Sequence, residues 1–135
     1  VSGEDITESR QHFVRMSMPE TYEALVEAGI TDDHSMGYAS VAGFRAGIAS
    51  PYKFYNLKKE EETMLTIHPF MFMDTTLSDY MGLKPEEYIE VVRPLIDEVM
   101  LVKGTLTGIW HNYALADDQS KHDVFREIIK SAAVQ

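Results

Sequence analysis

The chain has 135 residues, of which 44% are hydrophobic and 25% are charged, so it can bury a core and is not an intrinsically disordered sequence. Its formal net charge of −10 argues against a nucleic-acid-binding protein, because phosphate recognition needs clustered Lys and Arg. It contains no cysteine, which excludes disulfides and thiolate sites, and no apolar run reaches the roughly 18 residues of a membrane span.

The first part of the chain is predicted to contain one helix and three strands. An apolar stretch near residues 11–14 favours a strand, and SMPETYEALVEAG (17–29) is typical of a helix that ends at a glycine. The alternating segment SMGYASV favours a second strand near 36–41. MLTIHPF (64–70) has the pattern of a buried strand.

The remainder is predicted to contain two longer helices around one strand. Residues 83–104 carry an apolar stripe at helical spacing, and 120–133 do the same at the end of the chain. TLTGIWH (105–111) favours a strand between them. Strands that alternate with helices predict an α/β fold with mostly parallel strands, either an open sheet or a barrel.

Unusual polar residues gather in four stretches at the predicted strand ends. These stretches are SRQH (9–12), GFRAG (43–47), IHPFMFMD (67–74) and IWHNYAL (109–115). In α/β folds, chemistry gathers where strands end and loops begin, at the carboxyl edge of the sheet. We therefore expect the functional residues among these four stretches.

Two residues have both a functional and a structural interpretation. Arg45 lies between glycines and could bind a carboxylate, or it could form an ion pair that ties a loop to the fold. His111 follows an apolar strand and could act as a general acid or base, or it could be a core histidine with both nitrogens bonded.

Other polar residues favour structural interpretations. Asp74 could orient a histidine, bind a substrate hydroxyl or cap the short helix near Thr76. His68 is interpreted as a buried side chain bonded to backbone rather than a metal ligand, and His12 similarly. Asp32, Asp33 and His34 are typical of a turn. A His/Asp metal site among His12, His68, His111 and Asp74 lacks the close ligand spacing of known motifs.

Three segments resemble the later part of the polysaccharide deacetylase-like proteins common in Bacteroidetes. They are residues 9–47, 65–77 and 108–115, so that the resemblance extends over most of the chain, from the first of these segments to the last. The resemblance is most specific in SRQH, DDHSMGYA, GFRAG and WHN. It implies part of a distorted (β/α) barrel that removes acetyl groups from N-acetylated sugars with a divalent metal, zinc or similar.

The resemblance also implies roles for individual residues. Arg45 matches the arginine that pairs with the family's catalytic aspartate base, and His111 matches the general acid. Asp74 matches loosely the motif near that acid. Beside these catalytic residues, three further residues are expected to bind substrate: Trp110, Asn112 and Tyr52.

The family's two early motifs, which carry the base and an Asp-His-His metal triad, have no counterpart here. We therefore expect residues 1–135 to be the C-terminal half of one deacetylase-like barrel domain, with the metal ligands mostly outside this chain. A half-barrel exposes sheet edges and apolar strand faces. An N-terminal half or a partner chain is expected to close it, and this chain alone is expected to be inactive.

The leading hypothesis is a bacterial, metal-dependent carbohydrate de-N-acetylase whose partner is a carbohydrate substrate, with no nucleic acid or membrane involved. The alternative is a catalytically inactive, barrel-derived domain that binds glycan or protein. Ala46 and Gly47 favour this alternative, because they depart from the Arg-Pro-Pro-Tyr-like pattern usual after the family's arginine. Localisation stays open, with the cytoplasm favoured.

Overall fold

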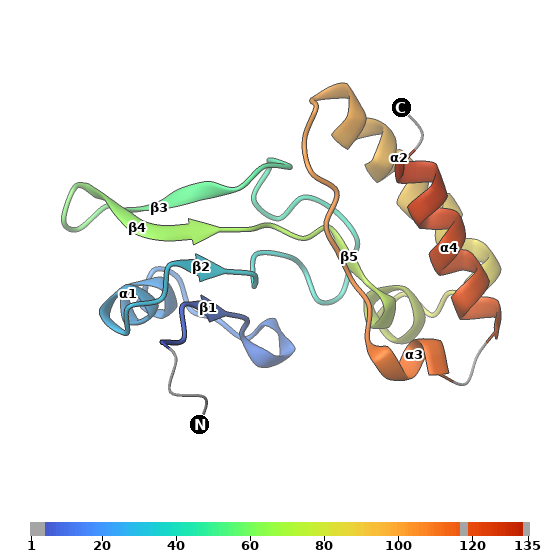
Figure 1. The fold of residues 1–135 in the computed structure, drawn as a ribbon, viewed down its shortest axis with the longest axis horizontal. Coiled ribbons are helices and arrows are strands. Elements are labelled where there is room, and N and C mark those ends of the chain that lie inside the picture. Colours follow the sequence, from blue (N-terminus) through green and yellow to red (C-terminus); the bar gives the residue numbers. More distant parts are fainter. Residues whose placement is uncertain (1–4, 117–118, 134–135) are drawn as a thin grey trace.

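Parallel strands and helices make up a mixed α/β structure in the computed structural model, which describes residues 5–116 and 119–133. Figure 1 shows the main sheet on one side and the long helices on the other. The sheet has the order β1 (Glu8–Ser9), β2 (Asp32–Asp33), β4 (Glu61–Ile67) and β3 (Tyr52–Asn56). The first three strands are parallel, and β3 is antiparallel to β4.

A second, separate pair of parallel strands lies closer to the long helices. It consists of β5 (Phe72–Met73) and β6 (Gly108–Ile109). The α-helices are α1 (Glu20–Glu27), α2 (Tyr88–Leu101), α3 (Asn112–Ala116) and α4 (Gln119–Ala133). Three short helical turns complete the fold: η1 (His12–Val14), η2 (Thr76–Tyr80) and η3 (Pro85–Glu87).

Several predicted elements are confirmed. Helices occupy most of 17–29, 83–104 and 120–133, and β4 covers the first part of the strand predicted at 64–70. The parallel pairing expected from alternating strands and helices is also present. The strand predicted at 105–111 is confirmed only over β6.

Two predicted strands are wrong. Residues 12–14 form a helical turn, and the ladder residues lie earlier, in β1. Residues 36–41 form no strand, because the Met36 carbonyl accepts from the Phe70 amide and the Gly37 carbonyl accepts from Arg45. The corresponding ladder residues are Asp32 and Asp33, which therefore belong to a strand and not to the turn expected from their sequence.

The described strands form two separate sheets and no closed barrel. At the edges of the main sheet lie β1 and β3, and within the described residues β6 pairs only with β5. The hairpin of β3 and β4 extends away from the long helices (Figure 1). The parallel strands and helices of the expected fold are thus present, and a part of a barrel is not confirmed.

Two hydrophobic clusters hold the structure together. In the first, α1 packs on the main sheet through Tyr22, Leu65 and Ile67. In the second, α2 and α4 pack on β5 through side chains that include Phe72, Val92 and Ile128. Each such side chain contributes on the order of 1.5–3 kcal/mol when it is fully buried. The two clusters fix the strand ends that carry the polar residues.

Candidate active site

The pairing of β5 with β6 places Asp74 beside His111. Phe72 is in register with Gly108, and Met73 with Ile109, so the residues after both strands emerge side by side. Gly108 permits this close pairing, because a Cβ atom there would lie 2.5 Å from the Phe72 ring. The segments that follow β5 and β6 are more than thirty residues apart in the sequence, and they meet at the carboxyl ends of these two strands.

The Asp74 carboxylate holds His111 by two hydrogen bonds. Oδ1 lies 2.5 Å from Nδ1 of the imidazole, and Oδ2 accepts from the His111 backbone N–H at 3.2 Å. The Asp74 side chain is 3% exposed, whereas the His111 side chain is 38% exposed. The carboxylate is thus inside the protein and fixes the ring, while the ring itself is partly exposed.

This geometry decides against the capping interpretation of Asp74. The short helix η2 begins after Thr75, and no side chain caps its first turn. The Asp74 carboxylate instead bonds His111, so the capping interpretation is wrong. A buried carboxylate that accepts from Nδ1 is the arrangement that orients a histidine for proton transfer at Nε2.

His111 opens into a cleft of about 690 Å³. One wall comes from residues 10–14, and the other from η2 and the start of α3. In Figure 1, the turn after β1 points toward the side of the molecule that carries the α3 helix. A cleft of this size with a few convergent polar groups is typical of a small-molecule site.

Two of the predicted substrate-binding residues line the same cleft. Trp110 and Asn112 flank His111 there. The Asn112 side-chain oxygen accepts from the Tyr113 N–H at 2.9 Å. The Trp110 indole packs on Phe125 of α4 with ring centroids 5.0 Å apart, and its Nε1 is buried without a hydrogen-bond partner in the described part of the chain.

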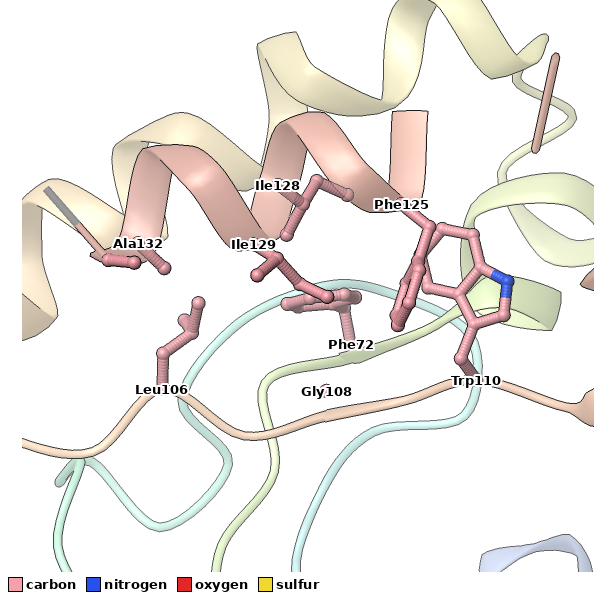
Figure 2. Close-up of a pocket in the computed structure, with 9 residues that line it drawn as sticks. Phe72, Leu106, Gly108, Trp110, Phe125, Ile128, Ile129 and Ala132 are labelled. Atoms are coloured by element: carbon pink, nitrogen blue, oxygen red, sulfur yellow. The ribbon is translucent and has the colours of Figure 1, made fainter. Parts of the chain in front are cut away.

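Figure 2 shows a second pocket, which Trp110 also lines. An apolar groove of about 290 Å³ runs between α4 and β6, with Ile129 and Phe125 above and Leu106 and Phe72 below. Ile129 is 49% exposed, so this groove is only partly filled by the chain's own side chains.

The structure does not bring Arg45 and Tyr52 into the cleft lining. Arg45 donates from Nη1 to the Gly37 carbonyl at 2.9 Å, and its guanidinium lies 5.8 Å from the centre of the Tyr38 ring. Over residues 5–116 and 119–133 it forms no ion pair with a carboxylate. Contrary to the sequence interpretation, GFRAG does not follow a strand.

Arg45 and Tyr52 share an electrostatic environment on the main sheet. Burial raises the pKa of Tyr52, and the nearby Arg45 charge opposes that shift. Burial raises the pKa of Tyr22 as well, with Asp33 as the second cause. The Tyr22 hydroxyl is buried and has no hydrogen-bond partner in the described part of the chain.

Sequence reasoning missed a chain of hydrogen bonds that fixes the SRQH segment. Asp33 is fully buried and accepts from the Ser35 hydroxyl at 2.8 Å. The Ser35 oxygen accepts in turn from the Gln11 N–H at 2.8 Å. From the sequence, Asp33 was interpreted as part of a turn and Ser35 was assigned no role.

His68 also differs from its predicted role. Its Nε2 lies 2.7 Å from an Asp32 carboxylate oxygen, so it bonds a side chain and not the backbone. Its ring stacks on that of His34 with centroids 4.5 Å apart. The His68 hydrogen bond, followed by that from Thr31, lowers the pKa of Asp32. Burial first, and then the neighbouring His68 charge, lowers the pKa of His34.

Stability is therefore expected to fall as His34 becomes protonated. The pKa of His34 is lower in the folded chain than its ordinary value of about 6.5. The neutral ring therefore contributes stability above that pH, and this stability declines as the pH falls below it. Urea unfolding at pH 7.5 and 5.0 measures the difference, which His34→Gln should reduce. His122→Gln, in α4, is the matched control. An unchanged pH difference in His34→Gln would contradict this assignment.

Among the described residues, no group of three His, Asp or Glu side chains is placed to hold a metal ion. The predicted set of His12, His68, His111 and Asp74 is not brought together, because His68 bonds Asp32 and His111 bonds Asp74. Likewise, no helix in the described ranges has the length and apolarity needed to cross a membrane.

Comparisons with models of protein families, with curated proteins and with solved structures find no match to this chain.

Proposed function

We propose that this chain is part of a metal-dependent carbohydrate de-N-acetylase, which hydrolyses the acetamide of an N-acetylated sugar. The observation that carries the proposal is the Asp74–His111 pair, whose imidazole opens into the cleft. The resemblance of residues 9–47, 65–77 and 108–115 to deacetylase-like proteins supplies the reaction class. The corresponding fold proposal is the C-terminal half of a distorted (β/α) barrel.

In this reaction, water adds to the amide carbonyl carbon and the C–N bond then breaks. The leaving nitrogen needs a proton, because an amide anion is a very poor leaving group. His111 donates this proton from Nε2, and acetate and a free amine are formed. Asp74 does not touch the substrate in this scheme; it orients the ring through Nδ1 and stabilises the imidazolium before transfer.

A base for the attacking water and the metal ligands belong to the missing half in this proposal. The described residues do not fit a metal site, so we derive no step through the metal. Arg45 is proposed to hold the catalytic aspartate of that half in its ionised form. Its lack of a carboxylate partner in the described part of the chain is consistent with this role.

Closure by an N-terminal half or a partner chain is supported by the free sheet edges. The outer edge of β6 has no strand partner among the described residues, and the apolar groove under α4 lies next to it. The opposite edge of the main sheet, at β1, is also free among the described strands. Unpaired edges beside apolar surface favour the addition of further strands.

The complete protein is expected to release acetate from an N-acetylated sugar when a divalent metal is supplied. Chelation should abolish the release, and added zinc should restore it, because a metal held by residues outside the described part of the chain would supply a Lewis acid for the reaction. Acetate is measured enzymatically, with the free amine as a second readout. Glycan binding without acetate release under any metal would support the alternative, an inactive binding domain.

A further inference from the structure

Aromatic side chains are concentrated around the cleft. Phe13 is 69% exposed, Tyr80 is 56% exposed and Tyr113 is 60% exposed, and all three line it. Large aromatic side chains are usually at least partly buried, so several exposed ones around a cavity indicate a ligand surface. The exposed rings come from both walls of the cleft.

Each wall carries one pair of aromatic rings in contact, tilted in the first pair and stacked in the second. On the first wall, the His12 and Phe13 ring centroids are 4.2 Å apart. On the second, the His111 and Tyr113 rings stack with centroids 5.2 Å apart and an angle of 26° between their planes. His111 is therefore part of one aromatic pair, and Phe13 belongs to a second pair, on a separate segment of the chain that lines the same cleft.

The Phe13 wall has an unfavourable backbone conformation. Phe13 has φ of 57° and Val14 has φ of 54°, in the left-handed region that bulky and β-branched residues avoid. The surrounding structure holds this turn: Gln11 N–H bonds Ser35, and Arg10 Nε donates to the His34 carbonyl at 3.3 Å. Such conformations persist where they place a functional side chain.

We infer that Phe13 and Tyr113 form a two-sided clamp that positions the sugar ring of the substrate at His111. The apolar face of a sugar ring carries C–H groups, which pack favourably on aromatic faces. The clamp holds the ring while Nε2 of His111 faces the leaving nitrogen. Phe13 is thus a substrate-positioning residue, and the choice of ligand rests on the proposed function.

Calorimetric titration of the complete protein with di-N-acetylchitobiose tests the clamp. A chelator is present, so that turnover does not consume the sugar. Phe13→Ala is expected to weaken binding about tenfold, as the loss of one aromatic contact predicts. Phe13→Tyr should retain the affinity. Phe13→Asn, which tolerates the left-handed backbone but lacks a ring, should lose it. Tyr55→Ala, on the β3–β4 hairpin, is the matched aromatic control.

Kinetics separate this inference from the proposed function. If the clamp and the deacetylase activity are both correct, Phe13→Ala raises KM and changes kcat little. Binding that depends on Phe13, without acetate release, would retain the clamp and refute the deacetylase. Acetate release with the same KM in Phe13→Ala would retain the deacetylase and refute the clamp. Equal affinity of the Asn and Tyr variants, or no binding at all, would also refute the clamp.

Discussion

Replacement of His111 by alanine is expected to lower kcat for acetate release in the complete protein by about 10²- to 10⁴-fold, the usual contribution of a positioned general acid. Without the imidazole, the leaving nitrogen must take its proton from water. The loss should appear in kcat more than in KM, because the proton is needed only as the C–N bond breaks. Acetate release under saturating sugar measures it.

His122→Ala is the matched control for this variant, because His122 lies in α4 and outside the cleft lining. It should leave kcat unchanged. Urea unfolding of His111→Ala checks that the fold is intact, which is expected because the His111 side chain is partly exposed. Wild-type turnover in His111→Ala would contradict the general-acid role.

Asp74→Asn is expected to lower kcat on the order of 10²-fold, although Asp74 does not contact the substrate. Asparagine has nearly the same shape, so the packing around this 2% exposed residue is kept. The amide can no longer stabilise a protonated imidazole, and the preferred ring tautomer is lost. The measurement is kcat as a function of pH, with the unfolding free energy as a check on structure.

The double variant separates a shared role from two independent roles. If Asp74 acts through His111, Asp74→Asn should cause little further loss in a protein that already carries His111→Ala. If the losses in kcat of the two single variants multiply in the double variant, Asp74 contributes independently of His111, for example by stabilising the β5–β6 pair.

Periodicity was sufficient to predict the long helices. The apolar stripe of 83–104 and the last helix needed only local information, and Tyr88, Val92 and Val99 are buried as that stripe requires. The strands were harder, because β1, β2, β5 and β6 are two residues long and show no alternation. Their positions depend on long-range pairing, which a local pattern does not encode.

The Asp74–His111 site was partly predictable. Both residues were singled out because they follow apolar strands, and parallel strands end at the same edge. The register of β5 against β6 could not be predicted from the sequence. This register brings Asp74 and His111 close enough to bond each other. The roles of Ser35 and Phe13 also depend on tertiary contacts, since one bonds Gln11 and the other lines the far wall.

The tautomer of His111 tests the Asp74–His111 pair most directly, without substrate or metal. Because a carboxylate can only accept, the bonded Nδ1 must carry the proton, and Nε2 of the neutral ring then carries none. Two-bond ¹H–¹⁵N NMR spectra distinguish the two forms. We predict the Nδ1–H form in the neutral ring and a shift toward the Nε2–H form in Asp74→Asn. An Nε2–H form that Asp74→Asn leaves unchanged would contradict the pairing.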